Sequence, residues 1–249
     1  MPENLPPGQT LCHLHAAARF LAAPQQGDGE LRRLLRETHG IDARRLSRLS
    51  LLALLGALPL CRGLPENPAI YLASPFSSPS RMIEMRQKLA AGLPSPLDFT
   101  ANLHNAATFQ LAQILGSSGN SVFLAADARS RLSPLHAALN ELLAEPGQTL
   151  LLGWAYEQSA ARGQEQEGSV WWKLSGSPPP EPAGWRISTA ETAAPAPPYP
   201  ESFLPAVLDL DEGLRRPGGL LLPPHGIWPA LRIEPLSPAQ TRTGKTRAT

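Results

Sequence analysis

The stretch LDFTANLHNAATFQLAQILGSSGNSVFLAAD, residues 97–127, decides how this chain is expected to fold. Apolar and small residues recur at helical spacing over residues 99–115, and Gly116 follows as a helix terminator. A Gly-Asn-Ser turn then leads into residues 121–126, a short apolar run typical of a buried strand. The run ends at Asp127, where the chain becomes charged. The stretch therefore predicts a helix, a tight turn and a strand in succession.

The flanking sequence repeats this alternation of helices and strands. The expected helices are Glu30–Gly40, Asp42–Leu58, Ser80–Ala91 and Ser133–Leu143, and the expected strands lie within residues 10–23, Ala69–Ala73 and Thr149–Tyr156. Such alternation is typical of an α/β domain with a mostly parallel sheet and helices on both faces. Residues 1–157 are therefore expected to form one such domain.

Regular patterning fades after residue 157. Nine of the 28 prolines lie between Pro178 and Pro205, and proline is tolerated in sheets chiefly at edges. Residues 158–235 are expected to form an irregular, proline-rich extension that could add edge strands, and residues 236–249 a disordered tail. A GC-rich genome would raise the proline content without any functional cause, so the prolines assign no function.

Charge and cysteine content argue against several classes of protein. The formal net charge of +1 disfavours broad nucleic-acid binding, which usually needs a strongly basic domain. Two cysteines without a CxxC pair fit a reducing cytosol. No apolar run is long enough to span a bilayer, and the first ten residues lack the features of a signal peptide. We therefore expect a cytoplasmic protein.

Motifs for metals and cofactors are weak. Cys12, His13 and His15 lie on one expected strand, where side chains two apart share a face, but no partner ligands are visible. Cys12 and Cys61 are both expected to be buried structural thiols. The chain also lacks a G-x-S-x-G elbow and a phosphate-binding loop. We expect neither a metal nor a cofactor.

The order of motifs resembles that of the β-ketoacyl synthases. In that family a helix written roughly N-x-x-A-x-x-I-A-x-x-L-G precedes a G-P-S turn, a dimer-forming strand and a T-A-C-A-S elbow with the catalytic cysteine. Asn105 and Leu115-Gly116 match the helix, Gly119-Asn120-Ser121 matches the turn, and Val122–Ala126 matches the strand. One departure is the sequence Ala106–Phe109, where the family often has Gly or Ala-Gly after the Asn.

Two further segments extend the resemblance. The arginine- and leucine-rich residues 31–58, and the strand, turn and helix of residues 69–107, are similar to the same family. The closest resemblance, over roughly residues 10–157, is to the short ketosynthase-like proteins called β-ketoacyl synthase chain length factors. These occur beside aryl-polyene and other type II polyketide or fatty-acid synthases.

The resemblance implies a thiolase-like fold of which only the ketosynthase N-terminal half is present. The elbow cysteine falls on Asp127 or Ala128, neither of which can attack a thioester. His225, in LPPHGIWP, does not match the His-Gly-Thr-type motif of the second half. The resemblance therefore implies no catalytic residue and a catalytically silent subunit, paired with an active β-ketoacyl synthase in a heterodimer.

The same resemblance implies roles for surface residues. The interface with the ketosynthase would contain Val122, Phe123, Leu124, His104 and Asn105. The partner's acyl tunnel would be lined and limited by Phe99, Asn102, Leu103 and Phe109. Ordinary core packing is the alternative for each of these four side chains.

A cluster of arginines suggests a second partner. Its members are Arg32, Arg33, Arg36, Arg44, Arg45 and Arg48. Acyl carrier proteins are acidic, so the cluster could steer their docking. The same arginines, near Glu30, Glu37 and Asp42, could equally form solvated helix faces with i,i+4 ion pairs.

Two other functions fit the sequence. The chain could be an acyl-thioester transferase or hydrolase that acts on its own through Asp127 or His104. It could also be a scaffold fragment with no role in chain length. Turnover of an acyl carrier thioester by the isolated protein would distinguish the enzyme from the silent subunit.

Overall fold

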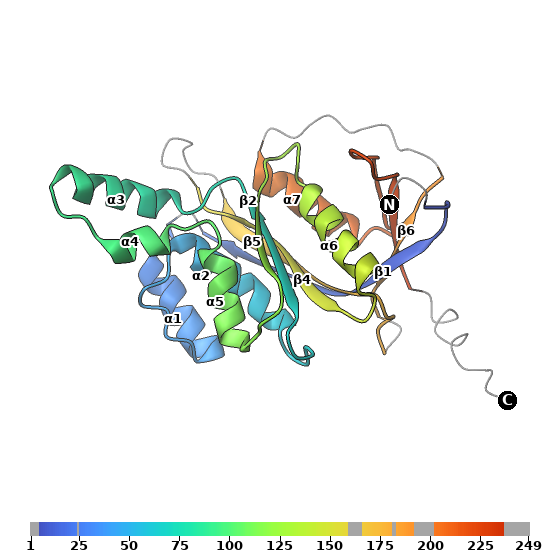
Figure 1. The fold of residues 1–249 in the computed structure, drawn as a ribbon, viewed down its shortest axis with the longest axis horizontal. Helices are drawn as coiled ribbons and strands as arrows, with labels where there is room; N and C mark the ends of the chain where they lie inside the picture. Colours follow the sequence, from blue (N-terminus) through green and yellow to red (C-terminus); the bar gives the residue numbers. More distant parts are fainter. Residues whose placement is uncertain (1–4, 24, 159–165, 181–182, 192–201, 237–249) are drawn as a thin grey trace.

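The computed structural model describes residues 5–23, 25–158, 166–180, 183–191 and 202–236. Its elements in chain order are β1 (Thr10–Ala22), α1 (Asp28–His39), α2 (Arg48–Ala57), the 3-10 turn η2 (Leu58–Leu60), β2 (Ala69–Ser74), α3 (Pro79–Ala90), α4 (Pro96–Ala101), α5 (Ala106–Leu115), β3 (Ser121–Ala125), α6 (Ser133–Ala144), β4 (Thr149–Tyr156), β5 (Glu167–Ser175), β6 (Trp185–Thr189), α7 (Phe203–Gly213), β7 (Leu220–Leu222) and β8 (Leu231–Pro235). Figure 1 shows the helices on the two sides of a twisted sheet. Within the described ranges, no helix is long and apolar enough to cross a membrane.

The strands form one mixed sheet, in the order β3-β2-β4-β5-β1-β6-β8-β7. Only β2 pairs in parallel, with β3 and with β4, because α3 to α5 and then α6 supply the long crossovers that parallel strands need. The other neighbours are antiparallel. The expected mostly parallel sheet was wrong: β5, the next described strand after β4, pairs antiparallel with both β4 and β1 in the centre of the sheet.

The helices lie on both faces of the sheet, as expected. α1, α2 and α5 cover one face, and α6 and α7 cover the other. α2 is apolar on all sides, so residues 49–57 are all buried between the sheet and its helical neighbours. Gly56 allows the close approach, since a Cβ there would lie 2.2 Å from Ser169 Oγ.

Two expected helix boundaries differ in the structure. α2 begins at Arg48 rather than at Asp42, because Ser47 caps it and accepts a hydrogen bond from the Ser50 N–H at 3.3 Å. The helix expected over residues 99–115 is divided into α4 and α5. Asn102 ends α4, and its Oδ1 accepts a hydrogen bond from Ser77 Oγ at 2.9 Å. α5 ends as expected, with Gly116 at φ +62°.

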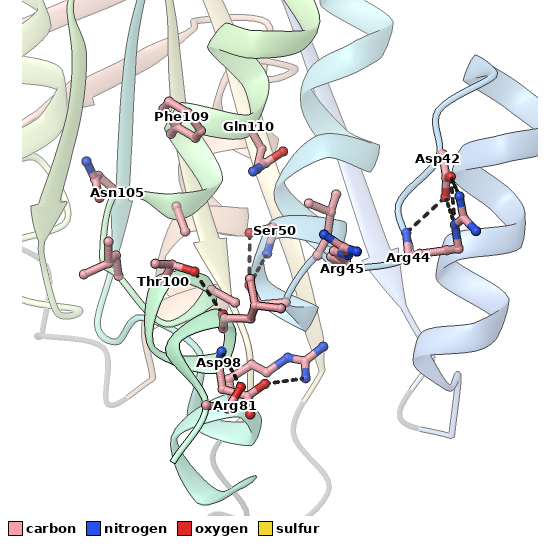
Figure 2. A pocket seen from close by; sticks show the side chains of 17 residues that line it. Asp42, Arg44, Arg45, Ser50, Arg81, Asp98, Thr100, Asn105, Phe109 and Gln110 are labelled. Carbon is pink, nitrogen blue, oxygen red and sulfur yellow. Dashed lines mark hydrogen bonds and ion pairs between the residues drawn. The ribbon is translucent and has the colours of Figure 1, made fainter. Parts of the chain in front are cut away.

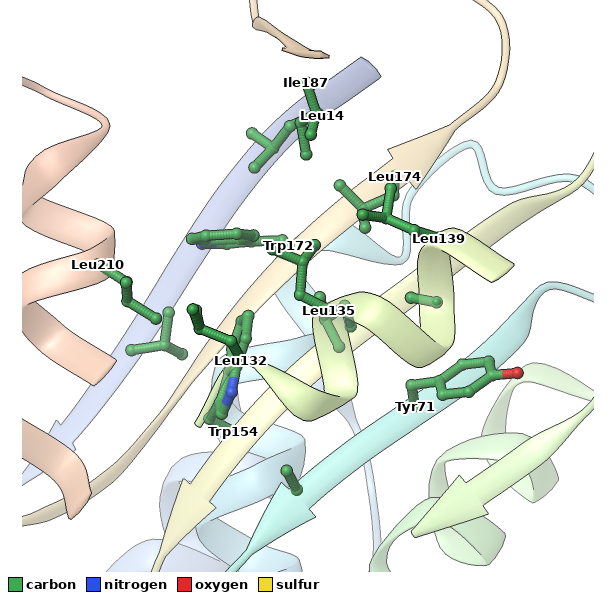
Figure 3. Packing of buried hydrophobic residues seen from close by; sticks show 14 of the residues in the cluster. Leu14, Tyr71, Leu132, Leu135, Leu139, Trp154, Trp172, Leu174, Ile187 and Leu210 are labelled. Atoms are coloured by element: carbon green, nitrogen blue, oxygen red, sulfur yellow. The ribbon is translucent and has the colours of Figure 1, made fainter. Parts of the chain in front are cut away.

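Residues after 157 add four strands and a helix to the same sheet. β5 occupies its centre, between β4 and β1, where an irregular extension with edge strands had been expected. Trp172 of β5 packs edge to face with Trp154 of β4, with ring centroids 4.9 Å apart, beneath α6 (Figure 3). The predicted disordered tail lies, from residue 237 onward, outside the described residues.

One buried histidine lies in this core. The His136 ring of α6 stacks on His225 and on Trp228, with centroid separations of 5.3 and 5.2 Å. His136 Nε2 has no hydrogen-bond partner among the described residues. Burial, together with the nearby His225, lowers the pKa of His136 to about 4. The neutral ring is therefore the form that the folded protein accommodates.

We predict that His136 makes folding pH-dependent. An unfolded histidine titrates near its ordinary pKa of about 6.5, so the unfolded chain binds the extra proton first as the pH falls from 6.5 to 4. Over that window the free energy of unfolding should fall by about 2–4 kcal/mol. The free energy of unfolding is measured by urea denaturation at pH 4.5 and at pH 7. In His136→Leu the difference between the two values should be smaller than in wild type by this amount. His39→Leu, at an exposed position of α1, is the control. Equal slopes for wild type and His136→Leu would contradict the prediction.

Candidate functional site

The expected nucleophile elbow is a closed polar turn. The Asp127 carboxylate accepts hydrogen bonds from the backbone N–H groups of Arg129 and Ser130 at 3.0 and 2.8 Å, and from Ser130 Oγ at 2.7 Å. The hydroxyl of Ser130 is the main reason that the pKa of Asp127 lies below its ordinary value. Ala128 is buried. Asp127 therefore serves as a turn cap, and all three hydrogen bonds fall on its Oδ1.

The two thiols lie outside this turn. Cys12 is fully buried in β1, and burial raises its pKa well above the ordinary range. Cys61 follows η2, and its Sγ donates to the carbonyl of Ala57 at 3.3 Å. Burial also raises the pKa of Cys61, to about 11. Because the thiolate is the nucleophile, neither sulfur is reactive at neutral pH.

β3 forms an edge of the sheet. It pairs only with β2 among the described strands, so the hydrogen-bonding groups on its other side face outward. Val122 and Leu124 pack toward the α6 face, whereas Phe123 packs toward the α5 face, and all three are half-buried. The exposed His104 ring meets Phe123 edge to face, with centroids 5.4 Å apart. The structure thus places His104 beside the strand, and the role of both in a subunit interface stays a prediction.

The segment from α3 to α5 exposes many large apolar side chains. Nine large hydrophobic side chains are exposed among the described residues, and eight of them lie between residues 82 and 114. These eight residues, which we call the apolar arm surface, are Met82, Leu89, Leu93, Leu97, Phe99, Leu103, Phe109 and Ile114. α3 buries none of its residues, and Figure 1 shows α3 and α4 extending away from the sheet. Clustered exposed apolar groups mark an interaction surface.

An ion pair between the exposed Lys88 and the largely buried Asp98 joins α3 to α4. Lys88 of α3 donates a hydrogen bond to Asp98 of α4, and Arg81 Nη1 lies 3.8 Å from the same carboxylate. The Lys88 hydrogen bond is the main cause of the lowered pKa of Asp98. α3 and α4 are therefore fixed to each other by charge, while their apolar side chains stay outside.

The predicted tunnel residues divide into two groups. Phe99, Leu103 and Phe109 are 59%, 44% and 52% exposed and belong to the apolar arm surface. Asn102 is buried and bonded to Ser77, a contact that orders the turn between α4 and α5. The three exposed side chains do not pack in the core of this chain, so the alternative of core packing fails for them. Contact with a partner's tunnel stays a prediction.

A cavity of about 1090 Å³ opens beside the arm, which we call the α2–α5 cavity. It is lined by the loop before α2, the first turn of α2, α4 and the start of α5. Leu103 and Phe109 line it, and so do Arg44 and Arg45 of the predicted arginine cluster. Figure 2 shows Arg44 and Arg45 on the opposite side of the cavity from Asn105.

The six arginines do not form one free patch. Arg48 binds Glu167 through Nε at 2.9 Å and Asp28 through Nη1 at 2.9 Å, so it is part of the core network. Arg32 pairs with Asp28, Arg33 with Glu37 and Arg44 with Asp42. Within the described residues, Arg36 and Arg45 form no ion pair through their side chains. The cluster is thus largely made of the intrachain pairs that the alternative interpretation expected.

Sequence reasoning missed Glu157, a buried carboxylate at the end of β4. Its oxygens accept hydrogen bonds from the backbone N–H groups of Leu49 and Ser80 at 2.9 and 2.8 Å, and from Ser78 Oγ at 2.6 Å. Burial raises the pKa of Glu157. This side chain joins the first turns of α2 and α3. The available signal was an acidic residue placed directly after a buried strand.

Comparisons with known proteins agree with this fold. Residues 24–161 match the family model described as "Beta-ketoacyl synthase, N-terminal domain". A chain of the ketosynthase ApeO in complex with its chain length factor ApeC, from Xenorhabdus doucetiae, is similar at 18% identity and a TM-score of 0.51, covering 75% of this chain and 86% of that chain. The ishigamide ketosynthase/chain length factor is similar at 16% identity and a TM-score of 0.55, covering 72% of this chain and 67% of that chain.

A third similar structure contains AntDE:AntF, a type II acyl carrier protein in complex with its ketosynthase. The identity is 14% and the TM-score 0.50, over 66% of this chain and 62% of that chain. At these identities the similarity establishes a shared ketosynthase fold. A search of curated proteins returned no match.

We predict that neither thiol accepts an acyl group. Incubation of the folded protein with an acyl carrier thioester at pH 7 should leave Cys12 and Cys61 unmodified in intact-mass and peptide mass spectrometry, because both thiols are protonated there. Iodoacetamide labelling of the urea-unfolded chain is the control and should modify both. A stoichiometric acyl adduct on either cysteine of the folded protein would contradict the prediction.

Proposed function

The chain belongs to the family of β-ketoacyl synthase N-terminal domains, and we propose that it is a catalytically silent, ketosynthase-like subunit of the chain length factor type. Its partner would be an active β-ketoacyl synthase that elongates polyketide or fatty-acid-type chains. The observation that carries the proposal is the exposed edge of β3, together with the exposed large side chains of the apolar arm surface. Two of the similar structures are themselves described as ketosynthases with chain length factors.

The edge strand supports pairing with another subunit. An unpaired edge invites a further strand, and soluble proteins usually protect such edges with charge or proline. β3 has neither, since its sequence is Ser-Val-Phe-Leu-Ala. Antiparallel pairing with the equivalent strand of a ketosynthase would satisfy its backbone groups. The apolar arm surface would extend this contact to the size of an obligate interface, above ~2,000 Å² in total.

Catalytic silence is supported by the chemistry of the elbow. A condensing enzyme needs a thiolate at the end of this strand. Here Asp127 caps its own turn, and the two thiols are protonated and lie elsewhere. The alternative of an independent acyl transferase or hydrolase gains no support from the geometry, because Asp127 Oδ1 caps its own turn and His104 packs on Phe123. Turnover of an acyl thioester by the isolated chain would favour that alternative.

Docking of an acyl carrier protein remains a secondary proposal. The exposed members of the arginine cluster are Arg33, Arg36, Arg44 and Arg45. Arg33 and Arg44 already have acidic partners, which weakens the positive electrostatic potential that would attract an acidic protein. Substituting Arg36 and Arg45 by Gln should slow association with an acidic carrier protein if this surface is used.

We predict that a charge on β3 abolishes assembly. In Val122→Asp or Phe123→Asp, an unpaired carboxylate would be buried at the interface, at a cost of about 3–5 kcal/mol, which corresponds to a loss of roughly two to four orders of magnitude in affinity. The measurement is co-purification with a co-expressed β-ketoacyl synthase, first shown to assemble with the wild-type chain.

Ile227→Asp is the matched control, because Ile227 is an exposed apolar residue, 53% exposed, outside the apolar arm surface. It should assemble as wild type does. Circular dichroism of each variant would confirm that the chain is folded. Wild-type assembly of both β3 variants would rule out this surface.

We predict that smaller side chains at the proposed tunnel wall lengthen the product. In the reconstituted complex, Leu103→Ala or Phe109→Ala would open space for a longer acyl chain. Each further two-carbon unit would gain up to roughly 1.6 kcal/mol, about tenfold in occupancy, if fully buried. Stiff polyene chains should gain less. Product distributions by mass spectrometry give the result, with Ile227→Ala as control. Unchanged product lengths in normally assembled variants would contradict the tunnel-wall role.

A further inference from the structure

One end of the sheet packs against helices on one face only. Ile187 of β6, with Leu231 and Ile233 of β8, belongs to the core that α6 and α7 cover. In the described part of the chain, no residue of β6, β7 or β8 belongs to the second core, which α1, α2 and α5 cover. The other face of these strands is therefore part of neither core. Antiparallel sheets can leave one face to solvent, so the side chains on that face decide what it can bind.

This open face carries positive charge. Arg186 of β6 lies opposite Glu234 of β8, and Ser188, two residues further on, lies opposite Arg232. Residues directly opposite in an antiparallel pair project from the same side, so Arg186, Glu234 and Arg232 share the open face. Arg186 and Glu234 form an ion pair. Arg232 is exposed and has no ion pair within the described ranges.

The same face continues across β1 to β5. His13 of β1 lies opposite Arg186 on one side and opposite Ser175 of β5 on the other. Ser175 is two residues from Lys173, so the Lys173 side chain projects from this face as well. Lys173 is half-buried and, among the described residues, has no ion pair. The surface that we call the basic sheet face consists of Lys173, Arg186, Arg232 and Glu234.

The sequence adds three more positive charges next to this face. Leu236, the last described residue, donates its backbone N–H to the Gly184 carbonyl at 2.9 Å, beside the start of β6. Residues 237–249 follow, with Arg242, Lys245 and Arg247 and no acidic residue. The face and this segment together hold six basic residues and one acidic residue, in a chain whose net charge is only +1. Positive charge is therefore concentrated at this end of the molecule.

The basic sheet face lacks the side chains by which proteins and nucleic acids bind. Protein interfaces depend on apolar and aromatic anchors, but none of the nine exposed large hydrophobic side chains of the described chain lies on β1, β5, β6, β7 or β8. Single-stranded nucleic acids stack on exposed aromatic rings, and no Phe, Tyr or Trp of these strands is exposed. A basic surface without anchors fits anionic lipid headgroups, which attract clustered Lys and Arg without such contacts.

We propose that the basic sheet face and residues 237–249 bind the surface of a bilayer that contains anionic lipids. Attachment of this kind is peripheral and depends on charge. In the sheet order, β3 lies at one end and β6, β8 and β7 lie at the other, so the lipid surface and a partner subunit at β3 would occupy different parts of the chain. Binding requires no partner subunit, and a test on the chain alone is therefore independent of the proposed function.

Co-sedimentation of the full chain with lipid vesicles tests the proposal. Vesicles of phosphatidylcholine with about one third phosphatidylglycerol should bind the chain, whereas vesicles of phosphatidylcholine alone should not. Each basic residue near the bilayer contributes about fivefold to binding. Arg232→Gln should therefore weaken binding about fivefold, and the triple variant Arg242→Gln, Lys245→Gln and Arg247→Gln about a hundredfold. Raising the NaCl concentration from about 0.05 to about 0.5 M should abolish binding, because salt screens exposed charges.

A matched variant controls for the loss of one positive charge. Arg86→Gln removes an exposed arginine of α3, which Figure 1 shows extending away from the sheet, and it should bind vesicles as wild type does. The proposal is overturned if both vesicle compositions bind equally, if Arg232→Gln or the triple variant binds as wild type does, or if Arg86→Gln weakens binding as much as Arg232→Gln. Tighter binding of a single-stranded oligonucleotide or of an acidic protein, lost in the same variants, would overturn it in favour of that partner.

Discussion

The buried carboxylate of Glu157 is the contact on which the arrangement of the functional surface depends. A charged group is costly to bury unless hydrogen bonds compensate it, and here two helix N-termini and a serine hydroxyl do so. The N–H groups at the start of a helix have no partner within the helix, so the carboxylate and the two helices satisfy each other. The starting points of α2 and α3 are thereby tied to the end of β4.

This junction is reinforced by a second carboxylate. Arg48, the first residue of α2, binds Glu167 at the start of β5 and Asp28 at the start of α1. Three elements that are distant in sequence therefore meet at one polar cluster. The α2–α5 cavity opens at this end of α2, and the arm formed by α3 and α4 begins there. The polar cluster is buried, whereas the neighbouring arm exposes apolar side chains, which is the reverse of the usual distribution in a self-contained domain.

That reversal is the physical basis of the proposed subunit role. An exposed edge strand and eight exposed large apolar side chains are unfavourable for a monomer, because both invite association. A partner subunit that covers them would pair the strand's free backbone groups and remove the apolar side chains from water. The Asp127 turn fits the same role, since the carboxylate caps its own loop and is no thiol nucleophile.

Local sequence patterns by themselves determined many of the elements and the edge strand β3. The periodicity of α1, α5 and α6, the stop at Gly116 and the short apolar run 121–125 are properties of neighbouring residues, which a sequence displays directly. The resemblance in motif order also identified the family. The sheet's mixed direction, the break at Asn102 and the central place of β5 were decided only by the tertiary structure. The break and the sheet order depend on partners outside the local pattern: Ser77 for Asn102, and β1 for β5. Local patterns do not encode such pairings, because burial and strand neighbours are set by the whole fold.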